Sequence, residues 1–258
     1  MSNSLELLPW FAPILSQAVT RVIINIGSHS VLEKGQSVAT SAFFNRMIFV
    51  KSGFLAQGLI NPANNAPFML TLAGANSFGI ATSAIDRLDN LPRRYWAATR
   101  CEIYTLNPEL LLRLAEVEKS WNKELNEYAL RRAVSDRLGL MIFQATGIEE
   151  RLGVFFTSLL LASSRAALRD LETSRDWLRL PTPPSRKLIA SVLSCRQSEI
   201  DDVLGKWFQD KTLRFVDGAL LMRAFTLATY WQWLQPFMQM QSEYVRRFRP
   251  MQELDFEP

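Results

Sequence analysis

The chain is poor in the residues that metal centres and disulfides require. Its 258 residues include one histidine, His29, and two cysteines, Cys101 and Cys195, which lie far apart in the sequence. These residues exclude a His/Cys metal cluster and a disulfide framework, so we expect no metal and no other cofactor. Isolated cysteines are typical of a reducing compartment, which predicts a cytoplasmic protein.

Long apolar runs and basic targeting segments are missing as well. No stretch of the roughly 18 uncharged apolar residues that a membrane span needs is present. Met1–Trp10 carries Glu6 and no basic residue, unlike a signal peptide. The sequence also lacks a nucleophile elbow, a phosphate-binding loop and metal-ligand spacings. We therefore predict a protein that is not an enzyme and has no membrane partner.

Charge of one sign is only slightly in excess. The net charge is +4 and the isoelectric point about 9.2, which favours a nucleic-acid partner weakly. Residues 148–222 contain 11 Lys and Arg against 10 Asp and Glu, a net charge of +1. Most strong DNA-binding domains carry a larger basic excess.

The most informative segment is 185–222, which reads as helix, turn, helix and hairpin. A short apolar helix leads into Ser194–Ser198, and a second helix carries apolar residues on one face at helical spacing. Asp217-Gly218 then separates two short apolar runs, as in a hairpin whose two turn residues need positive φ. This order predicts a winged helix-turn-helix, a DNA-binding module. The apolar face of the second helix consists of Ile200, Val203, Leu204, Trp207 and Phe208.

Residues 22–106 show short apolar runs separated by glycines. Met47–Val50, Phe68–Leu72 and Cys101–Leu106 read as strands, and Asn61–Pro67 as a loop. We predict a small β-barrel or roll here. Leu5–Val19, before it, reads as a helix.

A long helical segment follows the predicted roll. It starts at Asn107, an N-cap before Pro108, and runs to about Ala145 with a break near 116–120. One apolar seam on a helix between two domains predicts a partner helix and therefore a homodimer, and packing on the chain's own roll is the alternative. The residues expected to pair two subunits are Trp121, Leu125, Tyr128, Leu138 and Met141.

After the break at Thr146-Gly147, a helix resumes over Glu149–Ser163, and residues 165–184 read as a connector with some helix. Residues 223–249 are rich in aromatic side chains, and Pro236 is expected to start or kink a helix there. We expect this tail to dock within the protein, because exposed aromatic surface promotes association; a partner or membrane surface is the alternative.

These patterns predict an α+β chain in four parts. They are an N-terminal helix and β-roll (1–106), a connecting and dimerisation helix (107–147), a winged helix-turn-helix (148–222) and an aromatic helical extension (223–258).

Five short motifs follow one another along residues 22–222. They are Leu32–Gln36, Ile48–Gly53, Leu72–Gly79, Arg151–Leu160 and Ser185–Trp207. In this order they resemble the CRP/FNR superfamily of bacterial transcription regulators. The resemblance implies a cyclic-nucleotide-binding-like roll, a homodimer, double-stranded DNA as partner and RNA polymerase as a further partner.

Departures from the family pattern concern the effector. Cyclic-nucleotide members hold the phosphate with a glutamate after a Phe-Gly pair and with an Arg-Ser/Thr pair. Here Ile80 stands in the glutamate position, and Arg93-Arg94 lies near the arginine pair. Asp136-Arg137, to within one position, stands where two hydroxyl residues would read the adenine. We therefore expect independence from cyclic AMP. Cys195 is interpreted in two ways, as a thiol switch or as a buried residue of the turn.

The resemblance also implies the DNA contacts. The exposed face of the second helix is expected to carry Arg196, Gln197, Ser198, Asp202 and Lys206, residue types that can read base edges. The expected phosphate contacts are Arg186, Lys187, Lys211 and Arg214. Acids at 199, 201 and 202 would weaken binding. The sequence thus predicts a sequence-specific DNA-binding regulator, and the alternative is a regulator-like protein-interaction module that does not bind DNA specifically.

Overall fold

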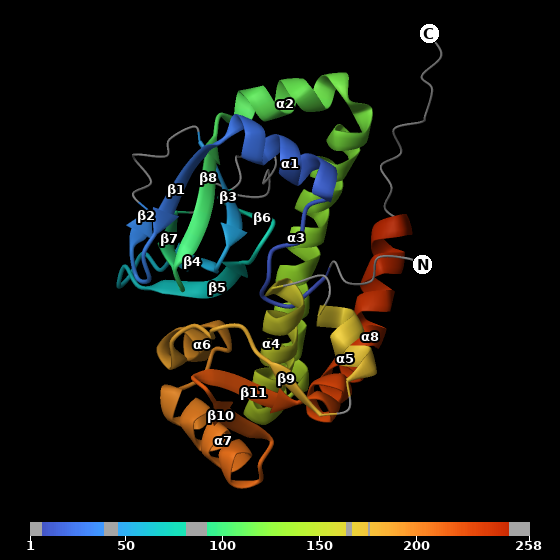
Figure 1. Ribbon diagram of the computed structural model, residues 1–258. Coiled ribbons are helices and arrows are strands. Elements are labelled where there is room, and N and C mark those ends of the chain that lie inside the picture. The colour runs from blue at the N-terminus through green and yellow to red at the C-terminus, as the bar shows by residue number, and fades with distance from the viewer. Residues whose placement is uncertain (1–6, 39–45, 81–91, 164–166, 175, 248–258) are drawn as a thin grey trace.

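A computed structural model describes residues 7–38, 46–80, 92–163, 167–174 and 176–247. Two antiparallel four-stranded sheets form the predicted N-terminal roll, with strand orders β1-β8-β3-β6 and β2-β7-β4-β5 (Figure 1). Gly53 turns the chain between β3 and β4 at φ 83°, where a side chain would collide with the Arg100 carbonyl. The strands are β1 (Ser28–Leu32), β2 (Ser37–Val38), β3 (Met47–Ser52), β4 (Leu55–Ile60), β5 (Pro67–Ala73), β6 (Ser77–Ile80), β7 (Arg93–Ala97) and β8 (Cys101–Leu106).

The helix predicted over Leu5–Val19 is wrong for the described residues 7–16; Leu5 lies outside them. The segment is extended and pairs with β5, since Ala12 donates to the Leu72 carbonyl and Leu72 to that of Trp10, both at 2.8 Å. Pro9 and Pro13 disfavour a helix in this segment. Without a helix here, the side chains of Trp10 and Phe11 are both buried. Helix α1 (Gln17–Ile26) begins where the Ser16 side chain caps it.

The connecting helices agree with the prediction. The Asn107 side chain accepts a hydrogen bond from the Glu109 N–H and starts α2 (Pro108–Val117). A break follows at Glu118, and α3 (Lys119–Ala145) runs along the whole molecule (Figure 1).

The winged domain follows α3 and matches the predicted order, with one strand more than expected. Strand β9 pairs with β11, so the sheet has the order β10-β11-β9, and the segment that holds it was predicted only as a connector. The elements are α4 (Ile148–Ser163), α5 (Ala167–Thr173), β9 (Trp177–Arg179), α6 (Arg186–Val192), α7 (Gln197–Gln209), β10 (Leu213–Val216) and β11 (Ala219–Arg223).

The aromatic extension forms one helix, α8 (Ala224–Arg247), that passes through Pro236 without ending. It lies against α4 and ascends beside α3 (Figure 1). Trp231, Leu234 and Met238 are buried in the same apolar core as α4, α6 and α7. The prediction that this part docks within the protein is confirmed for α8, whereas residues 248–258 lie outside the described part.

Candidate nucleic-acid interface

Helices α6 and α7 form the helix-turn-helix. The Ser185 hydroxyl accepts from the Leu188 N–H and caps α6. The turn reverses at Ser194, whose φ is 54°, and the Cys195 N–H donates to the Ala190 carbonyl at 3.0 Å. Ile200 and other apolar residues of α7 then pack into the core, so the opposite side of α7 is left to solvent.

The solvent-facing side of α7 is mainly polar. Gln197, Ser198, Asp202, Gly205 and Gln209 are all exposed, and they recur at spacings that keep them near one side of the helix. Arg196 is exposed at the N-cap of the same helix. Four of the five residues predicted for this face therefore lie together: Arg196, Gln197, Ser198 and Asp202.

Two of the acids that were expected to repel DNA are engaged within the protein. Glu199 accepts a hydrogen bond from the Arg196 N–H at 2.8 Å and so closes the first turn of α7. Asp201 forms an ion pair with Arg186 of α6 at 2.9 Å. Asp202 has no such partner among the described residues. Glu199 keeps its negative charge, and the ion pair offsets Asp201 only by occupying Arg186, so the net charge of this face is the one expected from the sequence.

Lys206 is exposed one helical turn after Asp202, and its side chain reaches α4. Its Nζ contacts a Glu149 carboxylate oxygen at 2.7 Å, and the Trp207 Nε1–H donates to the other oxygen at 3.0 Å. The hydrogen bond from Lys206, and after it the one from Trp207, lowers the pKa of Glu149. The hydrogen bond to Glu149 in turn raises the pKa of Lys206. Glu149 thus links α4 to two neighbouring side chains of α7, beside the buried apolar contacts that hold the helix.

The wing hairpin has the predicted turn: φ is 50° at Asp217 and 73° at Gly218. Lys211 is exposed at the start of the wing. The Arg214 guanidinium lies over the Trp177 ring, 4.0 Å from its centroid, on the far side of the sheet from the helices. The structure therefore brings Lys211 near α7 but separates Arg214 from it.

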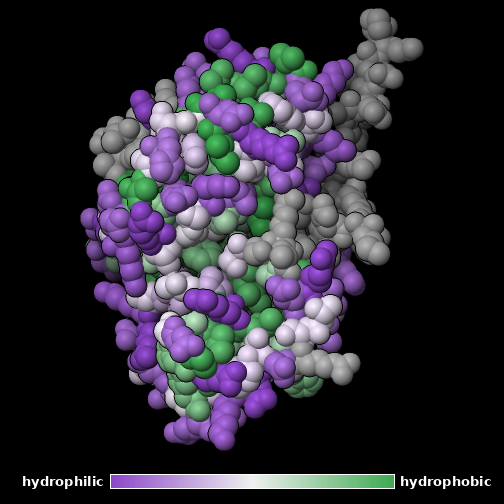
Figure 2. Space-filling model, viewed as in Figure 1, coloured by the Kyte–Doolittle hydropathy of each residue, from purple (hydrophilic) through white to green (hydrophobic). Residues whose placement is uncertain are grey.

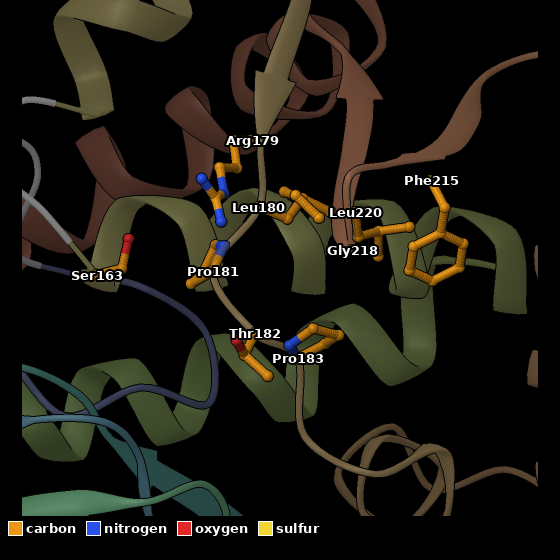
Figure 3. Close-up of a pocket in the computed structure, with 10 residues that line it drawn as sticks. Ser163, Arg179, Leu180, Pro181, Thr182, Pro183, Phe215, Gly218 and Leu220 are labelled. Atoms are coloured by element: carbon orange, nitrogen blue, oxygen red, sulfur yellow. The ribbon is translucent and has the colours of Figure 1, made fainter.

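An apolar patch also reaches the surface of the winged domain. Phe208 and Phe215 stack at 5.5 Å, and Phe215 is 65% exposed. In Figure 2, green residues gather over α7 and β10 within a mainly purple surface. Beside this patch lies a cavity of about 490 Å³, at the end of the hairpin (Figure 3). Its walls are formed by Ser163, Arg179, Leu180, Pro181, Thr182, Pro183, Phe215, Gly218, Ala219 and Leu220.

Cys195 is half-buried in the helix-turn-helix turn. Burial, and then the charge of Glu199, raises the pKa of its thiol to about 11. Reactive cysteines instead have a lowered pKa, so this environment favours the buried turn residue over the thiol switch.

The apolar seam predicted to pair two subunits lies largely inside the protein. Leu125 and Tyr128 pack against α1 and the roll, and the Tyr128 hydroxyl accepts from the Phe78 N–H at 3.0 Å. Leu138 is fully buried in the core shared with α4 and α8. The prediction that these three residues pair subunits is therefore wrong, and the alternative, packing within the chain, holds for them. Trp121 is half-buried and Met141 lies at the surface.

A second stripe on α3 remains at the surface. It alternates four-residue and three-residue steps, the spacing of a coiled-coil seam. Leu130 and Leu140 are 37% and 44% exposed. Sequence reasoning missed this stripe because its two leucines are separated by polar residues. It consists of Asn126, Leu130, Ala133, Arg137, Leu140 and Gln144.

The α3 residues that face the roll also differ from those predicted. Arg132 is buried and donates from Nη2 to Oε1 of Gln57 on β4, and the Ser135 side chain is fully buried. Asp136 is half-buried and Arg137 exposed. Arg132 thus contacts the roll directly, and Ser135 is a second buried polar residue of α3, one position before the expected pair. Arg132 was not singled out from the sequence, because a buried arginine cannot be distinguished from a surface arginine there.

The strands around the predicted effector position are described in part. Ile80 is half-buried at the end of β6. At the start of β7, Arg93 is half-buried and Arg94 is exposed, because adjacent strand residues point to opposite faces. Within the described ranges no group of three His, Cys, Asp or Glu side chains is placed to hold a metal ion. In the same part of the chain, no helix is long and apolar enough to cross a membrane.

No family model and no curated protein matches the chain, but solved structures do. FixK2 from Bradyrhizobium japonicum aligns with a TM-score of 0.60 at 10% identity, covering 80% of this chain and 97% of FixK2. CprK aligns with a TM-score of 0.55 at 14% identity, covering 88% and 97%. A protein from Eubacterium rectale described as a transcriptional regulator of the crp/fnr family aligns at 0.50 and 13% identity, covering 83% and 95%.

The chain has the CRP/FNR fold. The predicted architecture is thereby confirmed: a cyclic-nucleotide-binding-like roll, a long helix and a winged helix-turn-helix. These neighbours cover nearly all of their own length but leave 12–20% of this chain uncovered. At 10–14% identity the comparison identifies the fold, and the argument for function depends on the side chains described above.

Proposed function

We propose that the protein is a DNA-binding transcription regulator of the CRP/FNR type. The observation that carries the proposal is α7: its apolar face is fixed in the core, and its polar face, with Arg196 at the start, is open to solvent. A helix held in this way beside a hairpin suits insertion into the major groove. As in the sequence-based prediction, RNA polymerase would be a further partner.

The structure narrows the residues proposed to contact DNA. Arg196, Gln197, Ser198 and Asp202 remain the base-reading set. Lys187 and Lys211, both exposed, are the proposed phosphate contacts. Arg186 and Lys206 are weaker candidates because each pairs with a carboxylate, of Asp201 and Glu149. Arg214 is a weaker candidate because it lies on the face of the wing sheet that is turned away from α7.

A mobility-shift experiment on the DNA upstream of the protein's own coding region tests the proposal, at low and moderate salt. Arg196→Ala should weaken binding by about 1–3 kcal/mol and relax sequence preference, because a base contact is lost. Lys187→Ala should weaken all sequences alike and reduce the salt dependence. Arg21→Ala, at an exposed position of α1, is the matched control and should have no effect.

Unchanged DNA binding in both the Arg196 and Lys187 variants would reject the proposed interface. The alternative, a regulator-like module that binds protein, would then be favoured. Its supporting observation is the nearly neutral charge of the winged domain, +1 over residues 148–222.

We further propose that α3 pairs two subunits through the exposed stripe from Asn126 to Gln144. The spacing supports a parallel helix pair, with Leu130 and Leu140 at its apolar positions. Replacing both leucines by glutamate should give a monomer in sedimentation velocity. Val117→Glu is the control, because Val117 is 87% exposed on α2, away from the stripe. An unsubstituted protein that is monomeric at tens of micromolar would contradict the proposal.

Independence from cyclic AMP is proposed as well. It is supported by Ile80 at the phosphate position and by Arg132, whose long side chain occupies the side of α3 that faces β4. Calorimetric titration with cyclic AMP should show no binding at micromolar concentrations. Micromolar affinity would contradict the proposal without affecting the DNA-binding experiment.

A further inference from the structure

The outer face of the wing sheet is distinct from the DNA-facing side of the domain. Strand side chains alternate between faces, and Leu178, Leu213 and Met222 are buried against the helices. The residues that alternate with them point away from α6 and α7. These outward residues are Trp177 and Arg179 on β9, Arg214 and Val216 on β10, and Ala219, Leu221 and Arg223 on β11.

The side chains of this outer face carry positive charge only. It has three arginines and no carboxylate among its seven residues. The register places Arg214, Leu221 and Arg179 side by side across the three strands, with Arg223 opposite Trp177 in the neighbouring row. None of the three arginines forms an ion pair with another described residue. Arginines gathered in this way form a surface complementary to acidic groups.

Trp177 orders two of these arginines. The guanidinium carbon of Arg214 lies 4.0 Å from the centroid of its ring, and that of Arg223 lies 4.9 Å away. Arg223 also donates from Nε to the Lys211 carbonyl at 3.0 Å. Stacking restricts each guanidinium while leaving terminal N–H groups to donate, so carboxylate binding costs less side-chain entropy.

The cavity at the end of the hairpin adjoins this face, because Arg179 and Ala219 belong to both. In Figure 3, Arg179 extends along one side of the cavity and Phe215 lies at the other end, with Pro183 between them on the opposite wall. The lining mixes polar and apolar groups, and Leu180, Phe215 and Leu220 supply the part that suits an aromatic or branched side chain. A ligand that covers the outer face can therefore place an apolar anchor beside Arg179.

We propose that the outer face of the wing sheet binds an acidic segment of a partner protein that also carries an aromatic or aliphatic side chain. Duplex DNA seated on α7 lies on the opposite side of the sheet, so that DNA does not occupy this face. Leu221 at the centre of the arginine row and the exposed Val216 suit apolar side chains, which a phosphate backbone lacks. Carboxylates would pair with the arginines at either side of Leu221.

Fluorescence anisotropy with the full-length protein tests this proposal. The probe is a labelled short peptide that alternates Asp or Glu with Leu or Phe, measured at about 0.15 M salt. The same peptide with Asn and Gln in place of the acids is the comparison. Arg179→Glu combined with Arg223→Gln should weaken binding of the acidic peptide by about tenfold or more. Arg21→Glu combined with Lys34→Gln removes the same charge from exposed positions outside this face and should leave affinity within about twofold.

Three results would overturn the proposal. They are equal weakening by the two double variants, equal binding of the acidic and neutral peptides, and displacement of the peptide by single-stranded or duplex DNA of unrelated sequence. The last result would assign the face to nucleic acid. The thermal transition of each variant verifies folding, and Arg179→Gln alone, at an exposed position, serves if the double variant is unstable. Arg179 and Arg223 are not among the proposed DNA contacts, so the double variant should still bind specific DNA. The peptide-binding proposal can therefore fail while the DNA-binding proposal stands.

Discussion

Gly153 and Gly205 allow one substitution to be compared in two opposite environments. Both are glycines inside helices, on α4 and α7. A Cβ at Gly153 would lie 2.1 Å from a ring carbon of Tyr230 on α8, whereas a Cβ at Gly205 would meet no atom within 4 Å. We therefore expect alanine to destabilise the protein at 153 and to stabilise it at 205.

The magnitudes follow from helix propensity and packing. Alanine in place of a helical glycine gains about 0.5–1 kcal/mol, and Gly205→Ala should show most of this gain. At 153 the same gain is opposed by overpacking, which typically costs about 1–3 kcal/mol when atoms must shift. The net loss should be about 1–2 kcal/mol. A change of 1 kcal/mol corresponds to about 2–4 °C in Tm for a chain of this size.

Thermal and urea unfolding of both variants measure the difference. Tyr230→Leu should recover most of the loss caused by Gly153→Ala, because it removes the ring that the new methyl group meets. Equal stabilisation by both alanines would refute the packing of α8 on α4. Failure of the Tyr230 substitution to recover stability would place the defect elsewhere.

Three further outcomes follow from single contacts. Leu234→Ala, fully buried on α8, should cost about 2–5 kcal/mol by urea unfolding, whereas Phe225→Ala, 79% exposed on the same helix, should stay within about 0.5 kcal/mol; equal losses would contradict internal docking of α8. Glu149→Gln should destabilise the protein by about 1 kcal/mol at pH 7; since the pKa of Glu149 is lowered in the folded state, this difference should shrink as the pH falls below about 4.5, and a pH-independent loss would contradict the ion pair. Iodoacetamide should modify Cys195 at pH 8 about 100-fold more slowly in the folded than in the unfolded protein, because a pKa of about 11 lowers the thiolate fraction; mass spectrometry measures both rates, and equal rates would revive the thiol switch.

Local signals in the sequence were sufficient for the start of the connecting helices and for much of the winged domain. The Asn107-Pro108 start of α2 and the Asp217-Gly218 turn each depend on the chemistry of two adjacent residues, and the structure has both. The apolar periodicity of α7 likewise identified the side that packs, except for Phe208, which is exposed, and thereby the side left to solvent. These features are predictable because neighbouring residues determine them.

Features that depend on which surfaces meet were not predictable in this way. The periodicity of α3 showed one apolar side but could not show that Leu138 packs on the chain's own core rather than on a second subunit. Strand β9 is only three residues long, so alternation gave too little signal, and it becomes a strand through pairing with β11. The ion pair of Lys206 was not predictable either, because its partner, Glu149, is 57 residues away in the sequence.

The contact of the N-terminal segment with α3 and α4 was also not predictable, and it matters most because it lies where these two helices meet. Trp10 packs on Phe143 of α3 at 5.7 Å and on Phe155 of α4 at 6.4 Å, and it fills the space beside Gly139. Arg151 of α4 donates from Nη2 to the Phe143 carbonyl at 2.7 Å, across the same junction. The winged domain is therefore held against the roll by contacts within the chain.

Trp10→Ala tests this reasoning, since it removes the side chain shared by both helices. Truncating a buried tryptophan typically costs about 3–5 kcal/mol, and part of this loss should appear as local opening. Amide hydrogen exchange should accelerate at the end of α3 and the start of α4 before it does so in the roll. Trp121→Ala, at the half-buried start of α3, is the control and should leave this junction protected. If exchange at the junction is the same in both variants, the N-terminal segment does not hold the winged domain in place, and its orientation must then depend on Arg151 and α8.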